Sequence, residues 1–402
     1  MDLNQIISAR EKMKGIVHQT PLDFSQTFTD MSHNEVYLKL ENLQKTGSFK
    51  VRGSINKLTS LSKEELSKGV IAASAGNHAQ GVAYSSKMLN IPCTIVMPKG
   101  APLSKIQATK NYGAEIVLEG DAFDDALAHA MELSEKQGFT LVHTFDDDEI
   151  IAGQGTIGLE ILEQLPDVEA IICPVGGGGL IAGIAVAVKE KNPNVAIYGV
   201  EASACPSMAQ SLLEKKPISV PSGPTVADGI AVKKPGVRNL EIVEKYVDDL
   251  VTVDELEMIR TMFLLLERNK LLVEGSGASS LAALLYKKLN IKGKKVVALL
   301  SGGNVDVNFI SRIIERGMVE AGRYARFSII IVDKPGELQR VLTNITEADA
   351  NILSVHHTRM GRNIYPGYTE IEIAVETKSH EHILDLQKTL TAKGYRVDFW
   401  SL

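Results

Sequence analysis

Residues 173–180, CPVGGGGL, place four consecutive glycines between an apolar segment and a helix-like one. The run EAIICPV is typical of a buried strand, and LIAGIAVAVK after the glycines is typical of a buried helix. Residues without side chains let the backbone curl around an anion, and the helix that follows directs its N–H groups at the same point. The stretch therefore predicts a phosphate site at the end of a parallel strand.

The glycine stretch does not match the motifs of the large nucleotide cofactors. It lacks the G-x-G-x-x-G spacing with an acidic residue placed for a ribose, and no G-K-[ST] follows as it would in a P-loop. A flexible turn is the alternative, but such a turn hardly requires four glycines. We expect the phosphate to belong to a cofactor smaller than NAD or ATP.

The segments around this stretch alternate between short apolar runs and amphipathic helices. The pattern begins near residue 69 with VIAASAGN and HAQGVAYSSKMLN, and it ends with KKVVALLSGG and a helix at about residues 306–321. This alternation predicts β-α-β units and parallel sheets. We expect an α/β domain over residues 1–320 with two parallel-sheet lobes, the small lobe at about 48–147 being inserted in the large one.

The pattern changes beyond residue 322. The segments ARFSIIIVD, PGELQRVLTNITEADA, NILSVHHTRM, YTEIEIAVETK, SHEHILDLQKTLTAKG and YRVDFW predict strand, helix, strand, strand, helix and strand. This β-α-β-β-α-β order is that of the ferredoxin-like fold. We expect residues 325–402 to form a separate domain.

Composition excludes several classes of partner. The 43 basic and 49 acidic residues leave a net charge of −6 without a dense basic run, so nucleic acid and anionic membranes are not expected partners. No apolar run approaches the roughly 18 residues of a membrane span, and the first residues resemble a helix rather than a signal peptide. Three scattered cysteines without a C-x-x-C pair suit a reducing cytosol. We expect a soluble, cytoplasmic protein.

Two further polar turns follow apolar strands. In ASAGNHAQG, Ser74, Asn77 and His78 offer polar side chains, and Gly76 with the neighbouring N–H groups can hold a carboxylate. A simple helix-capping turn is an equally good interpretation of that stretch taken alone. The second turn is SGGN, which begins at Ser301. Ligands bind outside the carboxyl ends of parallel strands, so these turns and the glycine stretch can meet in one crevice.

Lys50 in GSFKVRG lies between Phe49 and Val51. A lysine that acts as a nucleophile or base requires desolvation to lower its pKa, and an apolar neighbour can provide it. Taken alone, a surface lysine with a buried stem is the more frequent explanation. The phosphate cradle and the anion loop favour a chemical role.

Four motifs in this order, TGSFKVRG, SAGNHAQG, PVGGGGL and SGGN, resemble those of the fold-type-II pyridoxal-phosphate enzymes, over about residues 5–320. Within that family, VADGIAV at 226–232 and VEGSGA at 273–278 are similar to segments of the threonine/serine dehydratases, also called threonine ammonia-lyases. The last 77 or so residues, with the DKPGEL turn, resemble a single ACT regulatory domain.

The resemblance implies a set of site residues. Lys50 would hold pyridoxal 5'-phosphate as a Schiff base, Phe49 would pack near its ring, Asn77 would hydrogen-bond the ring's 3-oxygen, and Ser301 would meet the pyridine nitrogen. The residues expected to bind the phosphate are Gly176, Gly177, Gly178, Gly179 and Leu180. Those expected around the substrate carboxylate are Ser74, Ala75, Gly76 and His78.

The resemblance also implies the reaction: L-threonine would give 2-oxobutyrate and ammonia, and L-serine would give pyruvate. A serine hydroxyl at the pyridine nitrogen makes the ring a weaker electron sink than an acidic partner would, which favours coupled elimination. Lys50 is the expected base. Related racemases have a serine at the position of Ala75 to protonate the opposite face, so its absence favours dehydration.

Two binding questions stay open. Some relatives bind a cation near the strand that ends in VEASACP, where Glu201 is a possible ligand, but Ser207 stands where metal-binding racemases have an aspartate. In the C-terminal domain, the resemblance implies an effector at Asp333, Pro335, Gly336 and Glu337, with Asn351 and Ile352 nearby. Isoleucine or valine feedback, nucleotide activation, and ligand-free pairing are the alternatives.

Rival functions are a non-catalytic amino-acid sensor and, within the enzyme class, a serine racemase or a β-replacement enzyme. A sensor has no need of Lys50, and the dehydratase-like segments disfavour β-replacement. We expect an allosterically controlled homodimer or homotetramer. The sequence leaves open the preference between threonine and serine, and whether the role is isoleucine biosynthesis or threonine breakdown.

Overall fold

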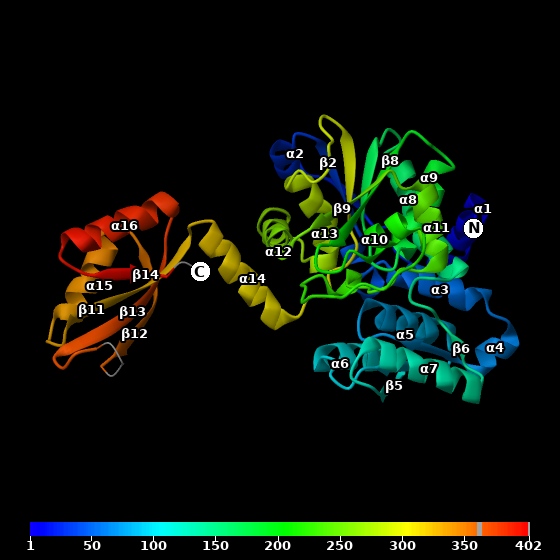
Figure 1. The fold of residues 1–402 in the computed structure, drawn as a ribbon, viewed down its shortest axis with the longest axis horizontal. Coiled ribbons are helices and arrows are strands. Elements are labelled where there is room, and N and C mark those ends of the chain that lie inside the picture. The colour runs from blue at the N-terminus through cyan, green and yellow to red at the C-terminus, as the bar shows by residue number, and fades with distance from the viewer. Residues whose placement is uncertain (360–363, 401–402) are drawn as a thin grey trace. The chain divides into compact units, whose positions relative to one another are not determined.

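The structure is a computed structural model, and it describes residues 1–359 and 364–400. The chain divides into two compact units, Met1–Asp306 and Val307–Leu402 (Figure 1). The first unit has two sheets and the second has one, and each unit has its own buried core. The two units are therefore described separately.

The first unit contains a six-stranded sheet in the order β1-β2-β10-β7-β8-β9. Neighbouring strands run parallel except β1, which pairs antiparallel with β2. The strands are β1 (Leu22–Phe24), β2 (Glu35–Leu40), β7 (Ala170–Pro174), β8 (Ala196–Ala202), β9 (Asp249–Val253) and β10 (Lys295–Leu300). All five residues of β7 are buried, because helices cover both faces of a central parallel strand.

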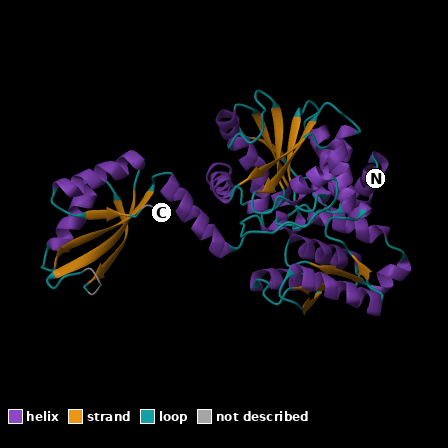
Figure 2. Cartoon of the chain, viewed as in Figure 1, coloured by secondary structure: helices purple, strands orange, loops and turns teal. Residues whose placement is uncertain are grey.

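A second, four-stranded parallel sheet in the order β5-β4-β3-β6 lies in the same unit. Its strands are β3 (Val70–Ala73), β4 (Cys93–Met97), β5 (Glu115–Leu118) and β6 (Thr140–Leu141). The two sheets form separate groups of strands, each with its own helices (Figure 2). The predicted α/β fold with two parallel-sheet lobes is confirmed.

Helices connect the strands of both sheets. They are α1 (Leu3–Met13), α2 (Gln26–Ser32), α3 (Lys50–Ser60), α4 (Lys63–Lys68), α5 (Asn77–Leu89), α6 (Leu103–Asn111), α7 (Phe123–Gln137), α8 (Asp148–Gln164), α9 (Gly179–Lys189), α10 (Ser207–Glu214), α11 (Val237–Tyr246), α12 (Glu255–Leu264) and α13 (Gly275–Leu285). Short 3-10 turns include η1 (Glu41–Leu43) and η3 (Asp228–Ile230).

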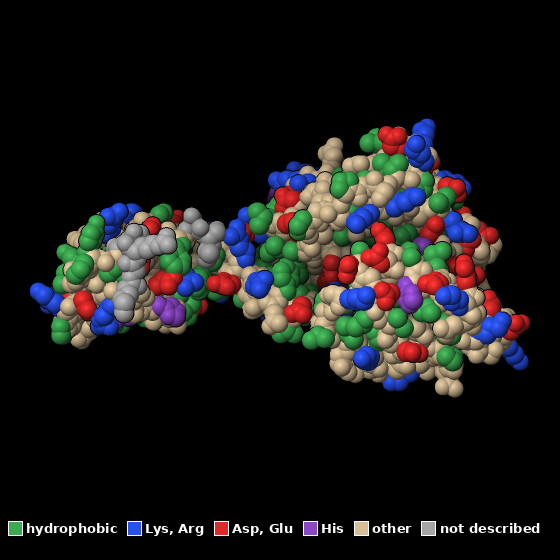
Figure 3. Space-filling view, turned by 60° about the horizontal axis from the view of Figure 1, so that its bottom comes forward, with side chains coloured by type: hydrophobic (Ala, Val, Ile, Leu, Met, Phe, Trp, Pro, Cys, Tyr) green, Lys and Arg blue, Asp and Glu red, His purple; other side chains and the backbone are tan. Residues whose placement is uncertain are grey.

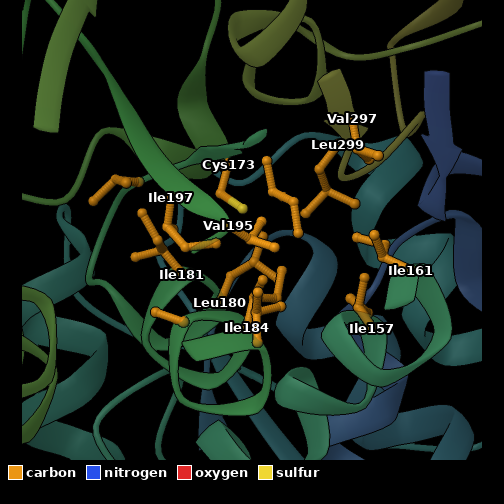
Figure 4. Packing of buried hydrophobic residues seen from close by; sticks show 14 of the residues in the cluster. Ile157, Ile161, Cys173, Leu180, Ile181, Ile184, Val195, Ile197, Val297 and Leu299 are labelled. Carbon is orange, nitrogen blue, oxygen red and sulfur yellow. The ribbon is translucent and has the colours of Figure 1, made fainter. Parts of the chain in front are cut away.

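The core of the large sheet lies between its strands and helices α8 and α9 (Figure 4). Its members include Ile157, Ile161, Cys173, Ile181, Ile184, Val297 and Leu299. The glycine stretch links β7 to α9, and both of these elements belong to this core. The segment that predicts the phosphate site is therefore anchored at both ends by buried residues.

Glycines allow three helices to pack closely. A Cβ on Gly153 in α8 would lie 2.6 Å from the Cα of Gly53 in α3, and a Cβ on Gly155 would lie 2.7 Å from the carbonyl oxygen of Gly183 in α9. Real Cβ atoms do not approach so closely, so α3, α8 and α9 pack here backbone against backbone. Because α3 begins at Lys50, this contact fixes the axis that carries that lysine.

The second unit has a helix followed by the six predicted elements. They are α14 (Val307–Glu320), β11 (Tyr324–Val332), α15 (Glu337–Glu347), β12 (Asn351–Thr358), β13 (Tyr368–Glu376), α16 (His380–Ala392) and β14 (Val397–Phe399). The strands form one antiparallel sheet in the order β12-β13-β11-β14. The predicted β-α-β-β-α-β order is confirmed.

The surface carries both signs of charge. Acidic and basic side chains are interspersed over the face seen in Figure 3. Within the described ranges, no helix is both long and apolar enough to cross a membrane.

Candidate active site

The segment that carries Lys50 is attached to the turn that begins at Ser301. The N–H of Phe49 donates to the carbonyl oxygen of Ser301 at 3.1 Å, Ser48 forms an isolated bridge with Gly302, and the N–H of Gly303 donates to Gly47 at 2.9 Å. The structure thus brings together two sequence motifs that are about 250 residues apart. Lys50 follows directly and starts α3.

The Lys50 side chain is partly buried. Its Nζ donates to the carbonyl oxygen of Thr144 at 3.0 Å and lies 5.2 Å from the centre of the Phe49 ring. Burial lowers the pKa of Lys50 to about 8, against the opposing charge of Glu274. The protein around the ammonium disfavours its charged form, and this lowers the pKa of Lys50.

The glycine stretch is packed against a phenyl ring. A Cβ on Gly177 would lie 2.3 Å from Cγ of Phe145, and a Cβ on Gly179 would lie 2.7 Å from the Phe145 carbonyl oxygen. Gly178 has φ of +95°, a conformation that favours glycine. The loop therefore admits no side chains on the side that faces Phe145.

Asn239 holds the glycine stretch from behind, because its Nδ2 donates to the carbonyl oxygens of Gly177 and Phe145 at 2.8 and 3.1 Å. The first N–H groups of α9 have no partner within the helix, because the helix starts at Gly179 and no helical turn precedes it. Unpaired N–H groups, a helix N-terminus and the absence of acidic side chains within residues 174–180 suit a phosphate.

The loop after β3 contains Ser74, Ala75, Gly76, Asn77 and His78. The hydroxyl of Ser74 accepts from the N–H of Gly76 at 3.1 Å, so that N–H is already engaged within the loop. Ala75 packs against the core of the small sheet. The N–H of Gly76, which the sequence offered as a carboxylate donor, is thus already paired within the loop.

His78 is buried, and its Nε2 lies 3.0 Å from the carbonyl oxygen of Val142. Burial and the charge of Lys50 lower the pKa of His78 to about 3. The imidazole is therefore neutral at pH 7, with its Nε2 proton directed at Val142. It holds the loop to the strand region and is not available as an acid.

Asn77 is bound on both sides of its amide. Its Nδ2 donates to Oε1 of Glu274 at 2.7 Å, and its Oδ1 accepts from Nδ2 of Asn304 at 2.7 Å. Glu274 lies just before α13 and is buried. Burial raises the pKa of Glu274 to about 7, and the nearby Asp228 adds to this effect.

Sequence reasoning used the VEGSGA segment as a signature and assigned no role to Glu274. Its contact with Asn77 could not be predicted from the local sequence, because the two residues are 197 positions apart. An acidic residue directly before a glycine-rich helix start is the one feature that could have suggested it.

Arg52, two residues after Lys50, lies in a buried ionic network that the sequence did not indicate. Its guanidinium contacts Glu41 at 2.7 Å and Glu160 at 2.6 Å, and Lys39 contacts Glu160 at 2.7 Å. All four side chains are buried. Burial would raise the pKa of Glu41, but the Arg52 charge outweighs it and lowers that pKa. The network ties α3 to β2, η1 and α8.

Glu201, the possible cation ligand, caps a helix. Its two carboxylate oxygens accept from the N–H groups of Met208 and Ala209 at 2.7 and 2.9 Å, and burial raises its pKa to about 7. Ser207 donates to the carbonyl oxygen of Val232 at 2.6 Å. Among residues 1–359 and 364–400, no three His, Cys, Asp or Glu side chains form a cluster suited to a metal ion.

The expected effector residues fall into two places. Asp333 pairs with Arg359 at 2.8 Å beyond the end of β11, followed by Pro335, and α15 starts at Glu337 after Gly336, with φ of +92°. Asn351 and Ile352 begin β12, and they pair with the end of β13 that also pairs with the start of β11.

The two groups of effector residues are therefore at opposite ends of the sheet, roughly 26 Å apart at 3.3 Å per residue. The expectation that they lie near one another in this unit was wrong, because α15 returns the chain to the start of β11 before β12 begins. One small molecule cannot touch both groups within a single domain.

Comparison with known proteins identifies the architecture. Residues 13–302 match the family described as pyridoxal-phosphate dependent enzyme. The chain is 50% identical over 395 residues to the L-threonine ammonia-lyase of Thermotoga maritima, covering 98% of both chains. Among solved structures, maize serine racemase has a TM-score of 0.75 at 35% identity, covering 79% of this chain and 98% of its own. Threonine deaminase isoform 2 of Solanum lycopersicum has a TM-score of 0.74 at 39% identity, covering 79% of this chain and 87% of its own.

Proposed function

Because this chain belongs to the pyridoxal-phosphate dependent enzyme family, we propose that it converts L-threonine to 2-oxobutyrate and ammonia, with L-serine as a second substrate that gives pyruvate. The observation that carries the proposal is the position of Lys50. Its side chain is partly buried, its Nζ donates to the carbonyl oxygen of Thr144, and its pKa is lowered to about 8. The chain is also similar to a threonine ammonia-lyase over 98% of its length.

The residues around Lys50 fit pyridoxal phosphate. The glycine stretch is closed on one side by Phe145, so that no side chain can occupy it, and its N–H groups suit a dianionic phosphate. Lys50 would hold the cofactor, Phe49 would pack near its ring, and Asn77 and Ser301 would contact its polar ring atoms. Gly176 to Leu180 would bind the phosphate.

Bound there, pyridoxal phosphate supplies electron withdrawal from the α-carbon of the amino acid. Lys50 is the base for the α-proton: with a pKa of about 8, roughly one lysine in ten is neutral at pH 7, against fewer than one in a thousand at the ordinary pKa. The water lost in elimination is taken up again when the unsaturated product is hydrolysed, so threonine gives one 2-oxobutyrate and one ammonia.

Other groups near Lys50 do not compete for this role. His78 stays neutral, and its ring nitrogen is directed at Val142. The hydroxyl of Ser74 accepts from the N–H of Gly76 and thereby shapes the loop in which Ser74, Ala75, Gly76 and His78 would meet the substrate carboxylate.

Serine racemisation is the second candidate, favoured by the likeness to the maize enzyme. Racemisation needs a proton donor on the side of the substrate opposite Lys50. Ala75 carries a methyl group that can neither give nor take a proton. We therefore propose that elimination dominates, and D-serine formation from L-serine as fast as pyruvate formation would contradict this.

We propose that about residues 325–402, the part of the second unit that follows α14, form an ACT regulatory domain. In this proposal the catalytic domain covers residues 1–320, with its small lobe at about 48–147. The strand order of the second unit supports this, and both solved relatives described above cover only 79% of the chain. The turn from Asp333 to Glu337 is the candidate effector site; Asn351 and Ile352 could join it only from a second copy. We further propose that the protein is a cytoplasmic homodimer or homotetramer. Its activity in amino-acid metabolism would be under allosteric control.

The test is release of 2-oxo acid from L-threonine and, separately, from L-serine by the purified protein with added pyridoxal phosphate. Lys50→Ala is the control, and cofactor absorption is recorded for both proteins. Formation of 2-oxobutyrate that the control lacks would support the reaction and the role of Lys50. If the cofactor is bound and neither substrate gives a 2-oxo acid, the lyase proposal is wrong, and β-replacement or sensing becomes the better explanation.

A further inference from the structure

The buried carboxylate of Glu274 accepts from two fixed N–H donors. Oε1 accepts from Nδ2 of Asn77 at 2.7 Å, and Oε2 accepts from the backbone N–H of Asn304 at 3.2 Å. The backbone of Glu274 is itself fixed, because its N–H donates to the carbonyl oxygen of Gly302 at 3.0 Å. A Cβ on Gly302 would lie 2.6 Å from Oε1, so the carboxylate lies directly against the turn that begins at Ser301.

These hydrogen bonds determine which way the Asn77 amide is turned. The carbonyl oxygen of Thr46 can only accept, so the Asn304 amide directs Nδ2 at it, at 2.8 Å. The second hydrogen of that Nδ2 meets Oδ1 of Asn77 at 2.7 Å. Oδ1 of Asn77 must therefore accept, and its Nδ2 must be directed at the carboxylate.

The orientation leaves one hydrogen-bonding group of Asn77 unused by these partners. A primary amide has two N–H donors, and Glu274 takes one of them. The second N–H is available to a bound molecule. Asn77 can thus donate to a cofactor oxygen while Glu274 and Asn304 hold its amide.

Both oxygens of Glu274 face N–H donors, so this arrangement of hydrogen bonds requires the ionised carboxylate. Burial raises its pKa to about 7, so its charge is sensitive to its neighbours. The charged groups that act on it come from three elements: Asp228 of η3 raises the pKa, while Lys105 of α6 lowers it, and Lys50 of α3 interacts with it as well. Lys105 and Asp228 also pair with each other at 2.6 Å.

We propose that Glu274 is a positioning residue that acts through Asn77, holding its amide so that one N–H points to the ring oxygen of the cofactor. The proposal rests on the assignment of Asn77 to the cofactor made under the proposed function. It does not depend on which substrate is used. It also explains why an amide would not replace Glu274: glutamine has one acceptor and one donor, and its donor would face the N–H of either Asn77 or Asn304.

The test is a double-mutant cycle on cofactor binding, measured by titrating cofactor-free protein with pyridoxal phosphate at pH 8 without substrate. The four proteins are the wild type, Glu274→Gln, Asn77→Ala and the double variant. We expect Glu274→Gln to weaken binding about ten-fold, the effect of one misdirected hydrogen bond. In the Asn77→Ala background the same substitution should change the dissociation constant less than two-fold, because the intermediary is missing.

Glu201→Gln is the matched control. Glu201 is also buried, its pKa is also raised to about 7, and it also accepts two N–H hydrogen bonds, but these come from α10. The Glu201→Gln substitution should change the dissociation constant for the cofactor by the same factor in the wild type and in the Asn77→Ala variant. If Glu274→Gln behaves in that additive way, or leaves affinity unchanged, the proposal is overturned.

Asn304→Ala is the second variant, for the case that Glu274→Gln fails to fold by circular dichroism. It removes the donor that fixes Oδ1 of Asn77 and keeps the backbone N–H to Glu274. We expect a several-fold loss of affinity that again disappears in the Asn77→Ala background. These titrations contain no substrate. A protein without lyase activity would therefore contradict the proposed reaction without affecting this test of Glu274.

Discussion

Arg52 and Glu41 form a two-point ion pair that solvent does not reach: Nε and Nη2 of Arg52 donate to Oε2 and Oε1 of Glu41 at 2.9 and 2.7 Å. Arg52 lies about half a helical turn after Lys50 in α3. Because its guanidinium pairs with buried carboxylates, its role is to stabilise the fold around Lys50. Buried charges are costly unless they are fully paired. Here Glu160 and Lys39 complete the pairing.

Arg52→Met should therefore destabilise the protein strongly. It leaves two buried carboxylates with Lys39 as their remaining cation, which costs about 3–5 kcal/mol of unfolding free energy. Urea unfolding of cofactor-free protein measures the loss. Arg10→Met is the control: Arg10 makes the same two-point contact with Glu163, but both side chains are about 40% exposed, and the loss should stay within about 1 kcal/mol. Equal losses would contradict this account.

Lys50 should reduce stability at neutral pH. Its pKa falls from 10.5 to about 8 on folding, so the unfolded chain binds more protons between pH 8 and 10.5, and the stability of the cofactor-free protein rises with pH in that window. Lys50→Met removes this dependence. We expect it to be more stable than the wild type at pH 7 by roughly 1–3 kcal/mol, and the gain should shrink by pH 10. Urea unfolding at both pH values decides; a gain that does not depend on pH would contradict the prediction.

Gly177→Ala should impair both stability and cofactor binding. Its Cβ would lie 2.3 Å from the Phe145 ring, so the loop or the ring must move. Such overpacking costs about 1–3 kcal/mol, and the displaced N–H groups should bind phosphate less well. Thermal unfolding and a pyridoxal-phosphate titration measure the two effects. Gly100→Ala, with nothing within 4 Å of the new methyl group, should match the wild type in both.

An effector of the second unit should act through the Asp333 turn. If the protein is under feedback control, L-isoleucine or L-valine at millimolar concentration should raise its Tm, since a ligand that binds only the folded state stabilises it. Asp333→Ala, which also frees Arg359, should change that shift, whereas Asp385→Ala, on the exposed face of α16, should not. A shift with nucleotides and none with amino acids would favour activation instead.

Local motifs predicted the parts of the site that lie at strand ends. The glycines of residues 176–179 and Ser301 follow β7 and β10, which are neighbouring parallel strands of the six-stranded sheet, so their turns lie at one edge. Asn77 follows β3 of the four-stranded sheet, and its hydrogen bond with Asn304 joins it to the turn that begins at Ser301. Longer-range partners could not be predicted. Glu160 is 108 positions from Arg52, and nothing in the local sequence distinguishes it from a solvated glutamate.

The error about Asn351 and Ile352 has the same origin. They follow the effector turn closely in sequence, but a helix of 11 residues lies between and carries the chain back along the sheet. Closeness in sequence indicates closeness in space at a turn and not across a whole helix.

The hydrogen bonds from Phe49 to Ser301 and from Gly303 to Gly47 attach the lysine to the six-stranded sheet, whereas the Ser74–His78 loop follows a strand of the four-stranded one. The backbone that presents the Lys50 amine and the loop that carries Asn77 thus belong to different sheets. A substitution in the four-stranded sheet can therefore shift the loop without moving the backbone from which Lys50 extends.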